Sequence, residues 1–516
     1  MKKNIVLFMV DQLSQKWLDA AFDGICELPN IKSLVDNGTM CSNYFSSNPV
    51  CCPTRATMAT GLTTRGHGVL ENGYSLNPQL PTFMHSLKKN GYRTGAFGKV
   101  HLRPHFEGFW PDYKQYGFDE THITEDGRGG EWLDWVKENH PEHFDSVLTT
   151  IWASHIPEFE EYGEGKEDLK KRINKLRSKA KWETDNFPEN MENSTTLPFP
   201  KELSQTEWIT MYAVNYIKEC KNNTPFFAQI SYVQPHSPFT PPADFMKDVN
   251  VENIPRPVPS EWKIDPHAPE YFSKLKLGKY VNNDMYARHC YFADLVHLDH
   301  QLGIILDTLK ENDVYDDTYI LFISDHGELL GDHGFYGKEE RHYDACIRSP
   351  FIISGPGLPK GRICTEFIQP EDFCPTILDL SDSLPELMPE MGNYLNIKKE
   401  DIPIFPGKSI LNLCRADAEP SWRKEAYIES YNPIWSMDVG DWARTIRTEK
   451  YRYTYYADKN GEQLFNLIDD PDEQHNLIAE PQYQDIKTEL KDRLFECIIK
   501  QDYPKTRREL FAFGVH

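Results

Sequence analysis

A continuous apolar run at 5–10, Ile-Val-Leu-Phe-Met-Val, constrains the fold of this chain more than any other stretch. A run without polar alternation is typical of a strand in a parallel sheet whose two faces are both covered by helices. Further buried strands are predicted at 225–233 and 319–323, and helices at 205–220 and 280–312. The sequence therefore predicts an α/β core built on a parallel sheet.

Polar side chains directly follow two of these strands. Asp11 and Gln12 come after the first run, and Asp325 and His326 come after the strand at 319–323. Because open α/β sheets place their ligands at the carboxyl ends of strands, we expect the two pairs to meet at one edge of the sheet. The structural alternatives are a helix cap for Asp11 and a strand-end turn for the Asp-His-Gly sequence.

The charge balance limits the partners of the chain. It has 56 Lys and Arg against 79 Asp and Glu, a formal net charge of −23 over 516 residues. This balance argues against nucleic acid or an anionic membrane as a partner, and an anionic substrate would need a local positive site. No stretch approaches the roughly twenty apolar residues of a membrane span.

The amino terminus and the cysteines predict a cytoplasmic protein. The first apolar run is short and lacks the small-residue cleavage site of a secretory signal. The 11 cysteines are scattered, odd in number and without zinc-type spacing, which favours reduced thiols. The glycosylation sequons at Asn37, Asn193 and Asn222 are then chance matches.

The stretch 49–61 holds Cys51, Pro53 and Arg55 in a Cys-x-Pro-x-Arg pattern. The pattern resembles the activation signature of the type I, formylglycine-dependent sulfatases. The resemblance implies that a maturation enzyme oxidises Cys51 to formylglycine, the nucleophile, and that Arg55 holds it in place. An anionic sulfate ester needs such a strong nucleophile within positive charge. The alternative is a buried Cys-Cys pair in a turn; a helix is predicted at 55–62.

The resemblance also implies a metal site. Its ligands would be Asp11, Gln12, Asp325 and His326, together with the formylglycine made from Cys51. Gln12 and His326 depart from the commoner Asp and Asn, and the Asp-Gln pair resembles the phosphonate monoester hydrolases and some sulfatases. With a substrate oxygen as the sixth ligand, this mainly oxygen set suits calcium or magnesium, whereas one imidazole favours manganese. We expect calcium.

Four more residues take roles that the resemblance implies. Lys99 and His101, in a Lys-x-His sequence after a predicted strand, would bind the sulfate and assist release of the sulfated intermediate. His236, in a Pro-His-x-Pro-Phe loop, and Lys338, after a glycine-rich loop, would assist the leaving oxygen. Taken without the family, these residues would be surface side chains or a turn histidine.

The resemblance spans 11–477 and implies an alkaline phosphatase-like α/β fold, a mixed sheet sandwiched by helices with a smaller carboxyl-terminal α+β domain. A proline-rich stretch predicts domains at 1–400 and 401–516. The stretch 105–205 is predicted to be a helical insertion that serves as a lid or a homo-oligomer contact. In the smaller domain we predict three strands and a final helix, at 425–430, 445–455, 463–467 and 482–500.

The leading functional hypothesis is a sulfuric ester hydrolase that cleaves the S–O bond of a small-molecule or carbohydrate sulfate. The alternative is a phosphonate monoester or phosphodiester hydrolase with the same site, which Gln12 and His326 favour. A non-catalytic binding module would need broken motifs, and none is broken. The organic part of the substrate stays open among carbohydrate, aryl and alkyl groups.

Overall fold

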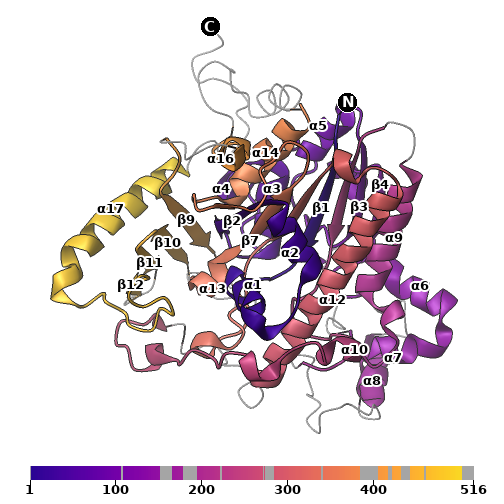
Figure 1. The fold of residues 1–516 in the computed structure, drawn as a ribbon. Coiled ribbons are helices and arrows are strands. Elements are labelled where there is room, and N and C mark those ends of the chain that lie inside the picture. Colours follow the sequence, from indigo (N-terminus) through magenta and orange to yellow (C-terminus); the bar gives the residue numbers. More distant parts are fainter. Residues whose placement is uncertain are drawn as a thin grey trace.

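The computed structural model describes most of the chain. The described residues are 2–105, 108–151, 166–177, 194–220, 224–270, 272, 284–338, 341–383, 405–415, 421–431, 442–457 and 461–501. Within these ranges a large sheet and a small sheet each carry their own helices (Figure 1). Among the helices of these ranges, none combines the length and the apolar character that a membrane crossing requires.

The large sheet is mixed and has the strand order β4-β3-β5-β1-β6-β7-β2-β8. β7 runs antiparallel to its neighbours β6 and β2, and the other neighbouring pairs are parallel. The strands are β1 Asn4–Val10, β2 Gly38–Phe45, β3 Arg93–Gly98, β4 Glu120–Ile123, β5 Phe226–Ser231, β6 Thr318–Ser324, β7 Arg348–Ser354 and β8 Arg362–Cys364.

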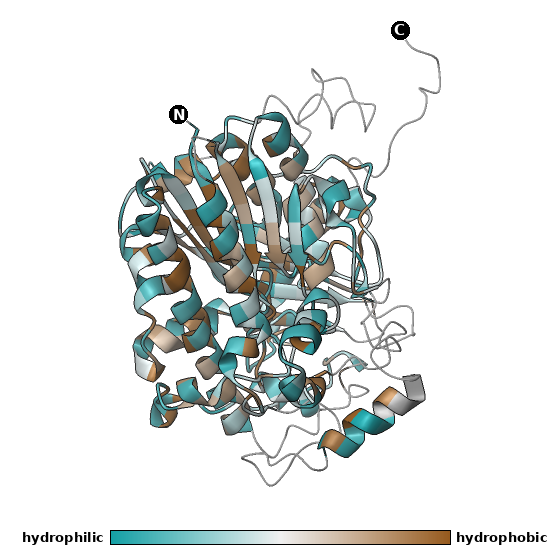
Figure 2. Ribbon diagram, turned by 90° about the vertical axis from the view of Figure 1, so that its right-hand side faces the viewer, coloured by the Kyte–Doolittle hydropathy of each residue, from teal (hydrophilic) through white to brown (hydrophobic). Residues whose placement is uncertain are grey.

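The central strand β1 shows why the sheet forms where it does. All seven of its residues are buried. Val6 and Phe8 enter one hydrophobic core and Leu7 and Met9 enter another, because successive side chains of a strand point to opposite faces. Figure 2 shows brown, apolar segments in the strands of the large sheet, which lies between the helical layers. The first polar side chain after this buried apolar run is Asp11, at the end of the strand.

Helices cover both faces of the large sheet (Figure 1). The core on one face includes residues of α1, α2, α9 and α12, and the core on the other includes residues of α3, α5 and α14. Their bounds are α1 Gln15–Ala20, α2 Pro29–Asp36, α3 Cys51–Thr60, α5 Phe83–Lys89, α9 Gln205–Glu219, α12 Asp284–Glu311 and α14 Phe373–Leu380. Ser14, not Asp11, caps α1, since its side chain accepts a hydrogen bond from the Lys16 N–H.

The predicted insertion at 105–205 is only partly helical. Its strand β4 extends the large sheet beside β3, and the described helices there are α6 Glu131–Asn139, α7 Phe144–Leu148 and α8 Lys166–Arg177. The parts of that prediction at 106–107, 152–165 and 178–193 lie outside the described residues. The stretch thus supplies an edge strand of the main sheet as well as surface helices.

The small sheet is antiparallel, with the order β12-β11-β10-β9. The stretch 445–455, predicted as one strand, is two strands, because the chain reverses at Glu449 and Lys450 without any glycine or proline to mark the turn. One face packs against α17, and the other contributes to a core with Phe45 and Phe335 of the larger part. The elements are β9 Glu425–Ser430, β10 Ala443–Thr448, β11 Tyr451–Tyr456, β12 Glu462–Asn466 and α17 Gln484–Lys500.

Candidate active site

Two strand ends bring the first four site residues together. β1 and β6 are parallel neighbours, with Val10 opposite Ser324, so the residues that follow them leave the same sheet edge side by side. Asp11, Gln12, Asp325 and His326 follow these strands and are almost completely buried. The backbone N–H of Gln12 donates to Oδ1 of Asp325 at 3.1 Å, which ties the two ends together. The predicted meeting at one edge is what the geometry shows.

Cys51 is the first residue of α3, which spans Cys51–Thr60. The helix was predicted to begin at Arg55; it begins four residues earlier because Pro53 fits the first turn of a helix, where its missing N–H is no loss. The Cys51 Sγ atom lies 3.7 Å from Oδ1 of Asp11 and 3.1 Å from Nε2 of His326. The thiol therefore points into the strand-end cluster.

The cluster has the donor set of a cation site. One ligand atom each from Asp11, Cys51, Asp325 and His326 lies within 4.8 Å of all the others. His326 uses Nδ1 at 3.0 Å from the Gly327 carbonyl oxygen, which leaves Nε2 as the atom that faces the cluster.

Gln12 supplies a further observation in favour of a cation. Its Nε2 donates to Glu328, but its Oε1 is buried and has no hydrogen-bond partner. Buried amide oxygens are normally satisfied, so an orphaned one beside two carboxylates fits a missing electropositive partner. Gln12 also has a φ of 66°, which is uncommon for a residue other than glycine. The residues present therefore fit a divalent ion with mainly oxygen ligands.

Arg55 connects the cluster to the sheet. Its Nε donates to Oδ2 of Asp325 at 2.8 Å, and its Nη1 donates to Oγ of Ser231 at 3.0 Å and to the Lys99 carbonyl oxygen at 2.8 Å. Its Nη2 is buried without a hydrogen-bond partner, 3.8 Å from Oδ2 of Asp11. The guanidinium therefore keeps one donor available to an anion.

Lys99 is more firmly held than the sequence indicates. Its Nζ forms ion pairs with Asp11 and, at 2.6 Å, with Oδ1 of Asp126. Burial opposes the charged form, but these two carboxylates raise the pKa of Lys99 well above its ordinary value. Asp126 follows β4 at the same sheet edge, and its only sequence signal is its place in an acidic pair after a short strand.

Lys338 contacts Cys51 and is itself in contact with His236. The Nζ of Lys338 lies 2.7 Å from Sγ of Cys51 and 3.0 Å from Nε2 of His236. Nδ1 of His236 is 2.5 Å from the Ser237 carbonyl oxygen, so Nδ1 carries the proton there and Nε2 accepts from the lysine. The two predicted leaving-group residues are thus in contact with one another, and Lys338 also contacts the nucleophile position.

The surrounding charges act on Cys51. Burial and Asp11 would raise the pKa of the thiol, yet Lys338, Lys99 and His326 outweigh them and lower it to about 5. The site is thus built to stabilise negative charge at residue 51. His101 lies beside it with a φ of 50°, and burial lowers the pKa of its imidazole well below the ordinary value.

Three further polar residues near Lys338 have structural roles. His333 stacks on Tyr343 at 3.8 Å between ring centroids, and His342 lies 2.8 Å and 2.6 Å from the hydroxyl oxygens of Thr445 and Ser430. Both therefore have structural partners in the small-sheet interface. Arg341 donates to the Lys338 carbonyl oxygen and so supports the loop that carries the lysine.

The fold, together with a buried site whose residues fit a metal ion, is that of a hydrolase of the alkaline phosphatase superfamily. A family model described as "Sulfatase" matches residues 3–383, and one described as "N-sulphoglucosamine sulphohydrolase, C-terminal" matches residues 331–500. The chain belongs to the sulfatase family and is a sulfatase, a hydrolase. The predicted α/β fold with a smaller carboxyl-terminal part is confirmed by this match and by the sheets.

Relatives of known name extend over nearly the whole chain. An arylsulfatase from Clostridium perfringens is 26% identical, over 97% of this chain and 94% of its own length. A choline-sulfatase from Rhizobium meliloti is 27% identical, over 93% of this chain and 83% of its own length. These relatives support sulfate ester hydrolysis as the activity.

Solved structures of low identity share the fold. The phosphonate monoester hydrolase of Agrobacterium radiobacter has a TM-score of 0.75 at 21% identity and covers 97% of this chain and 96% of its own. A protein solved in complex with its substrate D-glucosamine-2-N,6-O-disulfate has a TM-score of 0.67 at 19% identity, with 98% and 100% coverage.

Proposed function

We propose that this sulfatase cleaves the S–O bond of a sulfate monoester with a formylglycine made from Cys51 and one divalent metal ion. The single observation that carries the proposal is the position of Sγ of Cys51. It lies within 4.8 Å of three potential metal ligands and 2.7 Å from Nζ of Lys338. A nucleophile at that point would attack a sulfur atom whose oxygens lie between cations.

The metal would be held by Asp11, Gln12, Asp325 and His326 together with residue 51. When bound, the ion polarises the sulfate oxygens and favours the ionised form of the nucleophile. The mainly oxygen donor set favours calcium, with magnesium as a close competitor, and the imidazole of His326 makes manganese a third. Metal content of the purified enzyme, followed by reactivation of chelated enzyme with each ion, decides between them.

Each side chain around the sulfate has its own proposed role. Arg55 offers its unpartnered Nη2, and Lys99 compensates the charge of Asp11 at the metal edge. Lys338, in contact with Nε2 of His236, would hold and protonate the leaving oxygen. His101, whose ring nitrogens have no hydrogen-bond partner, would accept the proton whose loss releases sulfate.

A phosphonate monoester or phosphodiester hydrolase is the second candidate function. Gln12 favours it, because the Asp11-Gln12 pair resembles that of the phosphonate monoester hydrolases. A phosphonate monoester carries charge similar to that of a sulfate monoester, so the same cations would bind it. The sulfatase family match and the named relatives favour sulfate over phosphonate.

For the organic part of the substrate we propose a carbohydrate sulfate. The family model matched at 331–500 carries the name of a sulfohydrolase of a sulfated amino sugar, and one similar structure holds a sulfated glucosamine. If the natural substrate is instead a small aryl or alkyl sulfate, kcat/KM should not increase when a sugar replaces the small organic group.

The test uses enzyme whose Cys51 peptide shows the aldehyde by mass spectrometry. Hydrolysis of an aryl sulfate and of an aryl phosphonate monoester with the same leaving group is compared as kcat/KM. We expect the larger value for the sulfate. A larger value for the phosphonate would make the second candidate correct, and turnover by enzyme without the aldehyde would contradict the nucleophile.

A further inference from the structure

A second cluster of ligand-type side chains lies next to the proposed active site. His101 follows β3, and His105 and Glu125 lie in the segments after β3 and β4. One ligand atom from each of the three lies within 4.8 Å of the other two. The His101 and His105 rings are 3.8 Å apart between centroids, in an edge arrangement. His101 also belongs to a group with Cys51, so the cluster adjoins the nucleophile.

The atoms that face each other in this cluster lack hydrogen-bond partners. Both ring nitrogens of His101, Nε2 of His105 and Oε2 of Glu125 are buried and unpartnered. Nε2 of His105 is 3.6 Å from Oε2 of Glu125, which is longer than a hydrogen bond. Buried polar atoms are rarely left unsatisfied. Each neutral imidazole offers one lone-pair nitrogen and Glu125 offers an anionic oxygen, so the three side chains together can hold an electropositive partner.

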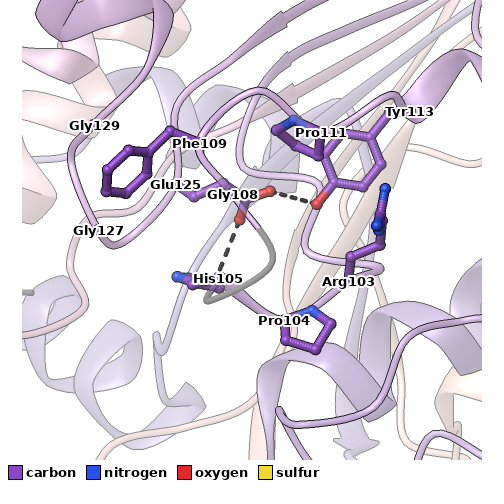
Figure 3. Close-up of a pocket in the computed structure, with 10 residues that line it drawn as sticks. All are labelled: Arg103, Pro104, His105, Gly108, Phe109, Pro111, Tyr113, Glu125, Gly127 and Gly129. Carbon is purple, nitrogen blue, oxygen red and sulfur yellow. Dashed lines mark hydrogen bonds and ion pairs between the residues drawn. The ribbon is translucent and has the colours of Figure 1, made fainter. Parts of the chain in front are cut away.

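The other oxygen of Glu125 shows that the carboxylate is held in position. Oε1 accepts hydrogen bonds from the Tyr113 hydroxyl at 2.8 Å and from the His101 backbone N–H at 2.9 Å. These bonds fix the carboxylate and aim Oε2 at His105, as Figure 3 shows. Support of this kind, in which one oxygen is anchored and the other is free, is typical of a metal-binding carboxylate.

A small cavity adjoins two of the three residues, His105 and Glu125. It is lined by side chains that include His105, Phe109, Tyr113 and Glu125 and has a volume of about 10 Å³ (Figure 3). This is about the space that one water molecule needs. The cavity is too small for an organic group, but it would give a bound ion one exchangeable ligand.

We propose that His101, His105 and Glu125 form a second cation site, for a divalent transition-metal ion such as Zn²⁺, with a water molecule as the fourth ligand. Two imidazoles, one carboxylate and one water are a ligand set that zinc accepts in tetrahedral geometry. The site differs in kind from the strand-end cluster around Asp325, whose mainly oxygen donors suit harder ions. The two sites should therefore select different metals.

Occupancy of this site would affect catalysis, and this consequence rests on the proposed function. If His101 accepts the proton that releases sulfate, an ion bound to its ring nitrogen removes the lone pair that does so. Zinc should then inhibit the enzyme without displacing the metal at the strand-end site. Removal of the zinc with a zinc-selective chelator, in the presence of excess calcium, should restore the activity.

Direct binding is measured on full-length Cys51→Ala protein loaded with calcium, because this variant lacks the thiol that would itself attract zinc. Zinc per chain after gel filtration and the visible spectrum of bound Co²⁺ are the readouts, since tetrahedral cobalt absorbs far more strongly than six-coordinate cobalt. We expect one zinc per chain and a tetrahedral cobalt spectrum.

Three variants in that background locate the ion. Glu125→Gln keeps the acceptor that Tyr113 uses and removes the anionic oxygen, so it should fold normally and bind zinc about tenfold or more weakly. His105→Ala should do the same, whereas His267→Ala, which removes an exposed histidine outside the cluster, should bind as the parent does. Unchanged zinc affinity and an unchanged cobalt spectrum in both cluster variants would overturn the site.

Inhibition is then measured with aldehyde-bearing enzyme. Zinc should slow sulfate turnover by the wild type, and the inhibitory concentration should rise about tenfold or more in Glu125→Gln. Zinc binding at the cluster without inhibition would keep the site and contradict the proton-accepting role of His101, so the two proposals fail separately.

Discussion

Buried charges occur in two regions of this molecule and are arranged in opposite ways. In the small sheet Arg452 is fully buried, forms an ion pair with Glu473, donates to Thr454 at 2.7 Å and lies over the rings of Tyr343 and Phe465. Nη2 of Arg452 is buried without a hydrogen-bond partner, but the other groups pair with one another, and in the described part of the chain no group of potential metal ligands surrounds them.

At the edge of the large sheet, by contrast, several charged groups converge and still leave atoms unpaired. Oε1 of Gln12, Nη2 of Arg55 and the ring nitrogens of His101 are buried without hydrogen-bond partners around Cys51. The difference teaches how to separate structural from functional charge. The structural pair leaves a single isolated atom unpaired, whereas the functional cluster leaves several unpaired atoms around one point, where a ligand can complete them.

The largest effect is expected from Cys51→Ala, which removes the nucleophile position. We expect kcat/KM for an aryl sulfate to fall by about 10⁴-fold or more, with the unfolding midpoint in urea little changed. Cys52→Ala is the matched control, because Cys52 is equally buried but lies outside the cluster. Equal losses of activity in both variants would show that the loss comes from disturbing α3 and not from removing the nucleophile.

The complementary change is Arg452→Met in the small sheet. It leaves Glu473 as an unpaired buried carboxylate, so the free energy of unfolding should fall by about 3–5 kcal/mol. The kcat of the folded fraction should stay at the wild-type value. Urea unfolding and kinetics at low temperature measure the two quantities.

Glu473→Gln combined with Arg452→Met should recover part of the lost stability, since no charge is then left unpaired. A drop in kcat that persists in the double variant would show that this pair supports the active site as well as the fold.

A single cation of the site should contribute less than the nucleophile. Lys338→Ala removes the ammonium next to Cys51 and His236, and we expect kcat to fall by about 10²–10³-fold. The loss should shrink with substrates whose leaving group is a good one, because such groups need little protonation. An equal loss with good and poor leaving groups would assign Lys338 to sulfate binding alone.

The smallest effect concerns Glu371, which lies between the two regions. Burial raises the pKa of this carboxyl to about 7, against lowering by the Ser47 hydroxyl that donates to it. The folded state thus keeps a proton that the unfolded state releases near pH 4.5. The protonated carboxyl therefore makes its full contribution to stability below pH 4.5. As the pH rises from 4.5 to 7 this contribution is lost, and the free energy of unfolding falls by about 3 kcal/mol.

Glu371→Gln should remove this loss, so the stability difference between variant and wild type should grow from pH 4.5 to pH 7. Urea unfolding at several pH values measures it. A difference that is constant with pH would mean that the carboxyl is ionised in the folded protein.

The sequence predicted the parts of the site that a strand or a short motif marks. Asp11 and Asp325 were located because each follows a continuous apolar run, Asp11 directly and Asp325 after Ser324, and such runs make buried parallel strands. The turn at Glu449 was missed because two charged residues reverse the chain where no glycine or proline signals it.

The residues that hold the cations in position could not be predicted. Asp126 binds Lys99, and Glu328 accepts from the Gln12 amide, yet each is a single acidic residue among many in this chain. Only the topology, which brings β4 beside β3 and the segment after β6 beside that after β1, makes these residues neighbours. Acidic residues that pair with a buried site residue are therefore not marked by any sequence motif.

The burial of α3 has a consequence for the order of events during synthesis. All ten of its residues, from Cys51 to Thr60, are buried. An enzyme that oxidises Cys51 must grip the peptide around it, and the folded protein offers no such peptide. The proposed oxidation therefore has to precede folding, so a chain that folds too early would be permanently inactive, however intact its structure.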